Sequence, residues 1–374
     1  MLLSDLQYQG TFSKRWLPTA TIYGDSIYVI GGEDNGAKND IIQFNIITNT
    51  FIDVQYSWIG DGSFIGRRAH TASLFQDDIY IIGGGQQNGL KFNDVVKFSI
   101  KENKLMNVPY YGYFTSRDDH TATVYSSAIY VIGGTYSWPW GRFNDIKKFD
   151  ISTSSWTDIP YAGQFSRRGK HTSTLVGNII YIIGGEGGDG IMNDVLTYDI
   201  TTATFTTVAT YAGSAAHIAE YYAGYIYVFG GGLQDLIRFD ISTNTFQTVS
   251  YSGIFDNRNS AAADIYLNKI YIFAGATTQT INSVVEVEIR WSMPTLSPTK
   301  APTFAPTYLP GRPTPMPTIS PTASPTVNQI VCSLNGGYGC CSLCGSSPCG
   351  IILSSAVTYI GIVLAILHIS ILIL

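Results

Sequence analysis

The six residues Ile-Tyr-Val-Ile-Gly-Gly at positions 27–32 return five more times along the chain with only small changes. The later copies begin at residues 79, 129, 180, 226 and 270, so the steps between successive glycine pairs are 52, 50, 51, 46 and 44 residues. Self-similarity at a period of this length is typical of proteins in which each repeat is one supersecondary unit. The sequence therefore predicts six structural units.

Other features keep the same phase within the repeat. An Asn-Asp pair follows the diglycine in four repeats, then an apolar strand such as 149–151, a polar turn and another aromatic or apolar residue. Each unit is thus predicted to hold four short strands, A to D, joined by Gly, Asn, Ser and Thr turns. The diglycine ends strand B, where a bulky side chain would block the exit or the neighbouring unit. Six such sheets are expected to stack radially, because none can bury both of its faces alone.

The diglycine, the downstream aromatics and the step of nearly 50 residues together resemble a Kelch-repeat β-propeller over residues 3–291. The resemblance implies an all-β, six-bladed fold. The sixth repeat departs from the pattern, because it has Ala274-Gly275 for the diglycine and Asn282-Ser283 for the Asn-Asp pair. It nevertheless stays in phase with the other five.

The phase also predicts how the ring closes. Strand D of the sixth repeat would start at Pro294, and proline disfavours a strand there. Residues 3–8 align instead with 156–161, the strand D segment of repeat three. We therefore expect an N-terminal strand to complete the last blade. A truncated seven-bladed ancestor is the alternative.

Composition excludes several classes of protein. Charged residues are 13% of the chain, about half of the usual share of roughly 25%, and hydrophobic residues are 45%, which excludes a disordered chain and a coiled coil. The net charge of −5 gives no basis for nucleic-acid binding. All five cysteines lie between residues 332 and 349, so the propeller has no disulfide or thiol chemistry.

The C-terminal part predicts a tether. Residues 292–331 form a Pro/Thr-rich stalk, expected to be disordered and extended over ~100 Å. Residues 332–349 form a Cys-rich juxtamembrane segment, whose cysteines are disulfide-bonded outside the cell or palmitoylated inside it. Residues 350–374 are apolar and predict either a transmembrane helix or a GPI-attachment signal. The secreted-type stalk favours an extracellular propeller, whereas the lack of a visible signal peptide favours the alternative, a cytosolic propeller on a tail anchor.

Two sets of residues are candidates for partner binding, both on the face formed by the B–C and D–A loops. Arginines stand 16 residues before the diglycine in five repeats, at Arg15, Arg67, Arg117, Arg168 and Arg258. In Kelch adaptors of ubiquitin ligases, arginines at this offset grip acidic peptides, so the resemblance implies that Arg67, Arg117 and Arg168 clamp carboxylate or sulfate groups. The alternative is structural pairing with nearby aspartates.

The second set is the aromatic B–C loop of repeat three, with Tyr136, Trp138 and Trp140. Such residues stack on sugars or on proline-rich peptides. The alternative is that they fold back over the edge of the blade.

Two further groups were considered for chemistry. His70, His120, His171 and His217 occupy one slot of successive repeats, which favours a structural role over a metal-binding or anion-binding ring. Glu220 and Asp264 replace the Thr or Ser of the other repeats in strand A, and are weak candidates for acid–base catalysis of the kind known in propeller mutarotases. The propeller lacks the cysteine of the galactose oxidase copper site and the Glu-x3-Asp-x3-His iron motif of nitrile-specifier proteins. No cofactor or metal is expected.

The sequence therefore predicts a membrane-tethered, non-catalytic module that recognises a protein or glycan through its B–C and D–A loops. A cytosolic scaffold on a tail anchor is the first alternative. A carbohydrate-active enzyme that uses Glu220 and Asp264 is the second.

Overall fold

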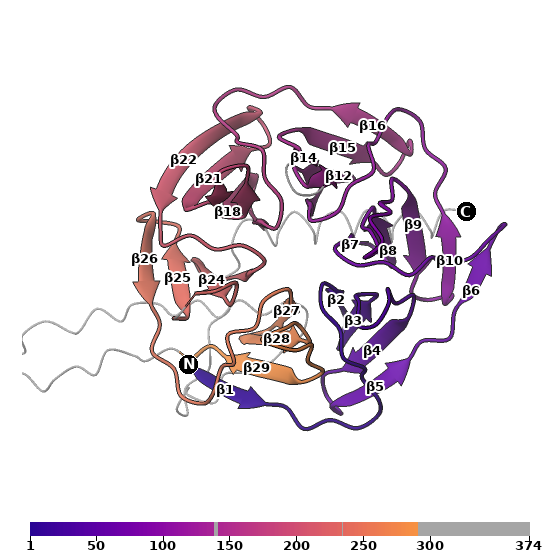
Figure 1. Cartoon of the computed structure of the whole chain (residues 1–374), viewed down its shortest axis with the longest axis horizontal. Coiled ribbons are helices and arrows are strands. Elements are labelled where there is room, and N and C mark those ends of the chain that lie inside the picture. Colours follow the sequence, from indigo (N-terminus) through magenta and orange to yellow (C-terminus); the bar gives the residue numbers. More distant parts are fainter. Residues whose placement is uncertain (138–140, 234, 291–374) are drawn as a thin grey trace, which may run out of the picture. The chain divides into compact units, whose positions relative to one another are not determined.

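Each repeat folds into an antiparallel sheet whose first strand lies nearest the centre of the molecule and whose last strand lies at the rim (Figure 1). The structure, a computed structural model, describes residues 1–137, 141–233 and 235–290. Within these ranges the chain is all-β and forms six blades, as predicted. The stalk, the Cys-rich segment and the apolar segment 350–374 lie outside them. No helix in the described ranges is long and apolar enough to cross a membrane.

The first three blades follow the predicted order of strands. Blade one consists of β2 (Thr19–Tyr23), β3 (Ser26–Ile30), β4 (Ile41–Asn45) and β5 (Thr50–Asp53). Blade two consists of β7 (Thr71–Phe75), β8 (Asp78–Ile82), β9 (Val95–Ser99) and β10 (Lys104–Asn107), with β6 (Ser57–Ile59) added in parallel at its outer edge. Blade three consists of β11 (Thr121–Tyr125), β12 (Ala128–Ile132), β15 (Ile146–Asp150) and β16 (Ser155–Asp158).

The remaining blades complete the ring. Blade four consists of β17 (Thr172–Val176), β18 (Ile179–Ile183), β21 (Asp194–Asp199) and β22 (Thr204–Thr210). Blade five consists of β23 (Ile218–Tyr222), β24 (Tyr225–Phe229), β25 (Ile237–Asp240) and β26 (Thr245–Thr248). Blade six consists of β27 (Ala262–Tyr266), β28 (Lys269–Phe273), β29 (Val284–Glu288) and the N-terminal strand β1 (Leu2–Asp5).

The predicted closure is confirmed. Strand β1 pairs antiparallel with β29, so that Leu3 lies opposite Val287, and Figure 1 shows β1 at the rim of blade six. The strand ends at Asp5, three residues earlier than predicted, although the Leu6 N–H still donates to the Val284 carbonyl at 2.8 Å.

The hydrophobic core is divided into six clusters, one at each interface between neighbouring blades. Strand β3 shows how: Ile27 and Val29 pack toward blade six, whereas Tyr28 and Ile30 pack toward blade two. Because alternate side chains of a strand point to opposite faces, a continuous apolar run buries both faces of one sheet. This explains why the four residues of strand B that precede the diglycine are aliphatic or aromatic in every repeat.

Short hairpins extend two of the B–C loops on one face of the ring. Strands β13 (Thr135–Ser137) and β14 (Gly141–Arg142) pair in repeat three, and β19 (Glu186–Gly187) and β20 (Gly190–Ile191) pair in repeat four. Repeat five has no such hairpin among its described residues. These differences between repeats shape the entrance described next.

Candidate functional site at the channel mouth

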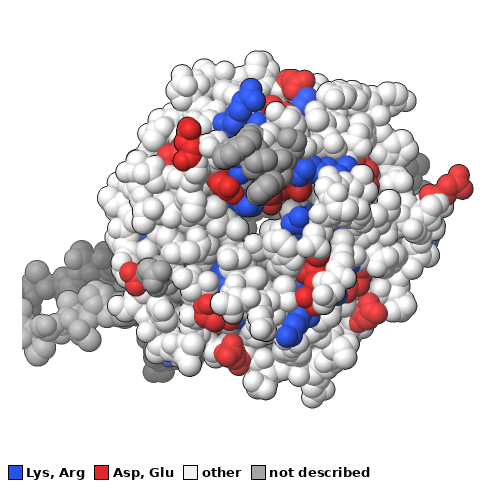
Figure 2. Space-filling view, viewed as in Figure 1, with Lys and Arg blue, Asp and Glu red and all other residues white. Residues whose placement is uncertain are grey.

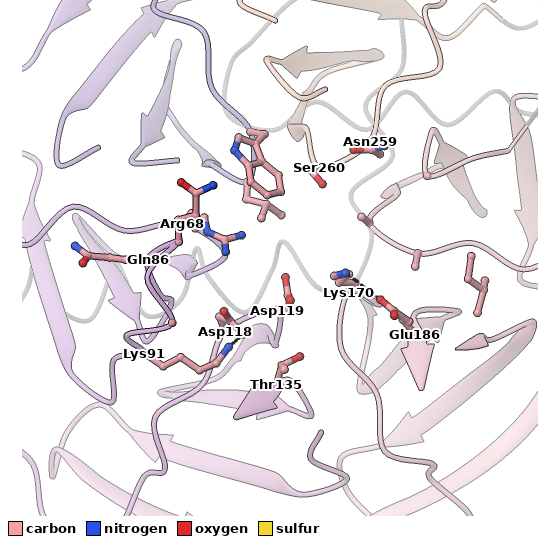
Figure 3. A pocket seen from close by; sticks show the side chains of 18 of the residues that line it. Arg68, Gln86, Lys91, Asp118, Asp119, Thr135, Lys170, Glu186, Asn259 and Ser260 are labelled. Atoms are coloured by element: carbon pink, nitrogen blue, oxygen red, sulfur yellow. Dashed lines mark hydrogen bonds and ion pairs between the residues drawn. The ribbon is translucent and has the colours of Figure 1, made fainter. Parts of the chain in front are cut away.

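The face that carries the B–C and D–A loops is hollowed at its centre by a cavity of about 1070 Å³, which we call the mouth (Figure 3). All six repeats contribute to it, through the segments that lead into the innermost strands and through the loops after the diglycines. A second cavity of about 130 Å³ adjoins the mouth and shares several of its residues.

One residue from each repeat forms a closed ring where the two cavities meet, which we call the collar. Its members are Leu17, Ala69, Asp119, Lys170, Ala216 and Ser260, all with φ between 51° and 57°. Each collar N–H donates to the carbonyl of the collar residue in the preceding repeat, with N···O distances of 2.7 to 3.0 Å, and Leu17 closes the ring by donating to Ser260. The left-handed conformation costs roughly 1–2 kcal/mol per non-glycine residue, which the ring of hydrogen bonds helps to offset. Since the collar N–H groups are all used, its side chains are what a ligand meets.

Charged residues of repeats two to four line one side of the mouth. The Arg68 Nε lies 2.6 Å from Glu33 Oε2, and its guanidinium stacks over the Trp16 ring at 4.8 Å. The Lys91 ammonium pairs with Asp118 in the adjoining part of the wall. Figure 2 shows acidic and basic side chains next to one another around the centre of this face.

Repeats three and four add a shared ion pair at the same wall. Glu186 accepts from Lys170 Nζ at 2.9 Å and lies 2.9 Å from Arg142 Nη2. Across the mouth, the described residues that repeat five contributes are all small: Ala215, Ala216, Gly231 and Gly232. The mouth therefore has a charged wall and a wall of small residues.

Asp119 differs from the other charged residues of the mouth. No hydrogen bond or ion pair to its carboxylate is found among the described residues, whereas Asp118 and Glu186 are both paired. Burial, followed by the charge of Asp118, raises the pKa of Asp119 to about 6, against the opposing influence of Lys170, Lys91 and Arg68. Figure 3 shows its side chain near the centre of the mouth, apart from the Lys91–Asp118 and Lys170–Glu186 pairs.

The predicted arginine clamps are buried in structural ion pairs. Arg67, Arg117 and Arg168 are at most 1% exposed, and each binds the Asp of its own Asn-Asp pair through two hydrogen bonds of 2.7–2.8 Å. Each also donates to the carbonyl of the first diglycine residue at 2.8–2.9 Å. The structure therefore shows the structural pairing of these arginines with aspartates, which was the alternative to a role as clamps for acidic groups. Their guanidinium groups have no exposed surface with which to grip a partner, so they do not enter the site.

The four histidines join neighbouring blades. Each Nε2 lies 3.0–3.1 Å from the hydroxyl of a Thr at the start of the preceding blade's innermost strand, such as Thr19 for His70. Burial lowers the pKa of His70 to about 3 and that of His217 to about 4, with Arg67 adding to the effect at His70. The imidazoles are therefore neutral, as this structural role requires. Among the described residues, no group of three or more potential metal ligands is found.

The aromatic loop is described only in part. Tyr136 lines the mouth, is 44% exposed and packs on the Phe143 ring with centroids 4.8 Å apart. Trp138 and Trp140 lie outside the described residues, so their predicted role stays a prediction.

The two carboxyl groups considered for catalysis lie on adjacent innermost strands, Glu220 on β23 and Asp264 on β27. Burial raises the pKa of both, to about 6 for Asp264 and well above the usual value for Glu220, where the charge of Asp264 adds to the effect. The Asp264 carboxylate also accepts the N–H groups of Ile22 and Ile265, at 2.7 Å each. Neither residue lines the mouth or the adjoining cavity.

Sequence reasoning located the face but missed most of the residues in the mouth. Arg68, Asp118, Asp119 and Lys170 stand one or two positions after the arginine slot of their repeats. The available signal was that these two positions vary in charge from repeat to repeat, whereas the arginine slot beside them is nearly constant. When the residue at one slot differs from repeat to repeat, the fold of the repeat does not require a particular side chain there.

Comparison with known proteins places these features in a family context. Residues 17–231, more than half of the chain, match the family described as "KLHDC2/KLHL20/DRC7 Kelch-repeats domain". Kelch domain-containing protein 3 of Rattus norvegicus is 33% identical over 98 residues, and that of Homo sapiens is 32% identical over 98 residues. The aligned stretch is 24% of this chain and 26% of each relative, so the chain spans about a quarter of the length of these relatives.

Proposed function

The chain belongs to the Kelch-repeat family, and on that premise we propose that it is a non-catalytic binding protein that captures a segment of a protein partner in the mouth of its propeller. Propellers of this family generally serve as protein-binding modules. The site would be the mouth rather than the buried arginines on which the sequence analysis centred.

The observation that carries the proposal is the construction of the mouth. Its volume of about 1070 Å³ exceeds that of most small-molecule sites, which hold roughly 300–1,000 Å³, and suits several residues of a peptide. Charged groups on one wall and small residues on the other offer specific hydrogen bonds beside room for a backbone. Loops held by a rigid ring are where binding residues concentrate.

The carboxyl groups of Glu220 and Asp264, the pair predicted as weak candidates for acid–base catalysis, do not line the cavity that a ligand would enter. If turnover of any sugar were found and were lost in Glu220→Gln, the carbohydrate-active alternative would replace this proposal.

The test is site-specific photocrosslinking with the full chain in its native cells. A photoreactive amino acid is placed at Ile191, which lines the mouth and is 63% exposed, or at Ile47, which is 67% exposed in a C–D turn. The C–D turns lie on the opposite face of a four-stranded meander, so the two probes differ in face but hardly in exposure.

A protein crosslinked from residue 191 and not from residue 47 supports the proposal. Crosslinking from residue 47 alone contradicts it, because the partner would then bind the other face. The same crosslinking is repeated in the double variant Trp138→Ala and Trp140→Ala. If the crosslink from residue 191 persists, the aromatic loop does not take part in binding, and the reason for expecting a glycan ligand is lost.

We further propose that residues 292–374 tether the propeller to a membrane. The support is compositional: a Pro/Thr-rich stretch followed by 25 residues without Asp, Glu, Lys or Arg from Gly350 to Leu374. Protease protection on intact cells tests the side of the membrane, with a tag in the propeller of the full native gene product. Cleavage of the tag indicates an extracellular propeller, whereas protection until detergent is added indicates the cytosolic scaffold, once an internal lumen has been excluded by selective permeabilisation.

A further inference from the structure

The collar places one carboxylate, that of Asp119, at the centre of the mouth, where none of the described residues pairs with it. Asp119 is held in the left-handed conformation by hydrogen bonds on both sides, from its own N–H to Ala69 and from the Lys170 N–H to its carbonyl, at 3.0 and 2.9 Å. Its Cα–Cβ bond cannot change direction without opening the ring. Asp119 lines both of the cavities that the collar separates.

The neighbouring cations are already engaged. Lys91 pairs with Asp118, Lys170 pairs with Glu186, and Arg68 lies between Glu33 and the Trp16 ring. None of them is within ion-pair distance of the Asp119 carboxylate, although all three lie close enough to influence its pKa. Desolvation already disfavours the charged form of Asp119, so the free energy of that form falls when a charged donor arrives.

A ligand can reach Asp119 from the mouth. The described residues of repeat five that line the mouth, Ala215, Ala216, Gly231 and Gly232, project little or no side chain and leave room for a ligand on that side. The long, flexible side chains of lysine and arginine can extend from a peptide backbone into such a space, with the charge at their tip.

We propose that Asp119 binds the cationic side chain, lysine or arginine, of the protein segment that the mouth captures. This inference rests on the proposed function, since it names the chemistry of the same ligand. The incoming ammonium or guanidinium supplies the hydrogen bonds that Asp119 lacks, in a recess where such charge-assisted bonds are strong.

The experiment is peptide selection on the full chain, solubilised in mild detergent and immobilised. A display library of random eight-residue peptides is selected against the wild-type protein and against three variants. Asp119→Asn removes the charge and keeps the collar, because asparagine tolerates the left-handed region well. Asp119→Lys reverses the charge with a residue that the collar already accepts at Lys170. Asp5→Asn is the matched control, since Asp5 is exposed on the rim strand β1.

We expect wild-type protein and Asp5→Asn to enrich peptides with Lys or Arg at one position, and Asp119→Lys to enrich Asp or Glu there. The affinity of a selected basic peptide should fall on the order of tenfold or more in Asp119→Asn. Its binding to wild-type protein should also weaken as pH falls below about 6, since Asp119 is then protonated, and this dependence should vanish in Asp119→Asn. Asp118, Lys91, Arg68, Lys170 and Glu186, the other charged groups that face the mouth, are ion-paired and are unchanged in that variant.

Enrichment without a preference for basic residues, or equal affinity of the basic peptide for Asp119→Asn, overturns the inference about Asp119 and leaves the proposed function standing. If a protein is crosslinked from residue 191 but no peptide is selected, the inference about Asp119 is likewise overturned and the proposed function stands. If neither a crosslink at residue 191 nor any peptide is obtained, both the inference and the proposed function are wrong.

Discussion

A buried arginine in each of five repeats shows how strongly one residue can be bound to the architecture. The guanidinium links the lead-in of strand A, the diglycine carbonyl and the Asn-Asp turn of the same blade, and stacks on Phe rings, such as that of Phe143 at 3.8 Å from Arg117. Repeat five has Ser214 in this slot and no Asn-Asp pair, so donor and acceptor are lost together. In repeat six, Asp256 replaces the missing aspartate as the partner of Arg258.

This arrangement predicts a large loss of stability from a small change. Asp145→Asn leaves the fully buried Arg117 without its carboxylate, which should lower the free energy of unfolding by about 3–5 kcal/mol. Glu102→Gln is the control, because Glu102 and its partner Lys104 are both exposed and their pair should contribute little to stability. Chemical denaturation measures both. Similar losses in the two variants would contradict the structural role.

The carboxyl groups of Glu220 and Asp264, on the innermost strands, should make the stability of the protein depend on pH. The pKa values of Glu220 and Asp264 are raised in the folded protein, so the folded state favours their protonated forms. The stability that these groups give is complete below the unfolded-state pKa values near 4, and it is lost as the pH rises through the folded-state pKa values. The melting temperature should therefore fall between about pH 5 and pH 8. Glu220→Gln should flatten this fall and raise the melting temperature at pH 8, on the order of a few degrees.

Glu102→Gln is the control, since Glu102 is exposed and its pKa is lowered by Lys104, which places its effect below this pH range. Calorimetry of both variants across the range is the measurement. A pH profile that is the same in Glu220→Gln and in wild type would show that the buried carboxyl groups do not limit stability.

At the scale of the element, the two glycines that end strand B have different requirements. The second needs glycine: Gly134 has φ of +100°, and a Cβ there would lie 2.7 Å from the His120 Cβ. The first lies near φ of +60°, which other residues can adopt, and Ala274 does so at +59° in repeat six. A Cβ at the equivalent Gly31 would lie 2.6 Å from the Arg67 carbonyl oxygen and 3.0 Å from the His70 ring of the next blade. In the blade that follows Ala274, Pro18 stands in the slot of that histidine.

Substitution by alanine should separate these effects. Gly134→Ala combines a disfavoured φ with a backbone clash and should lower the free energy of unfolding by well over 1 kcal/mol. Gly89→Ala has a similar φ of +90° and no heavy atom within 4 Å, so it should cost about 1 kcal/mol from the backbone conformation alone. Urea denaturation gives both values. Equal costs would mean that the strand exit relaxes around the added methyl group.

At the scale of the whole molecule, the ring depends on one short strand from the other end of the chain. Leu3 in β1 is only 3% exposed and packs in the cluster between blades five and six. The last blade thus gains its rim strand only when residues separated by almost the whole propeller meet. Such a non-local pairing is formed at a high cost in loop entropy, which makes it the weak point of the ring.

Leu3→Ala should therefore destabilise the protein by about 2–5 kcal/mol and open blade six first. Hydrogen exchange should show faster exchange in β29 and β28 than in wild type, while β12 on the far side keeps its protection. Leu90→Ala, at a side chain that is 49% exposed, should leave exchange unchanged. If exchange in Leu3→Ala rises equally in all blades, the ring unfolds as one unit and closure is not its weak point.

The sequence by itself determined the number of blades, their strand order and the closure by β1. These features rest on the repeat period and on apolar alternation, which act locally and recur six times, so that each copy confirms the others. It also pointed to the loop face, because that is where the repeats differ.

Only the tertiary structure decided which charges are paired. Whether Arg117 or Arg68 faces the mouth depends on a difference of one position in the lead-in of strand A, whose backbone turns at the collar. The collar itself joins residues from six repeats through bonds that no single repeat encodes. Periodicity predicts that a slot recurs, but the partner of a side chain in that slot comes from the next blade or loop, and only packing brings the two together.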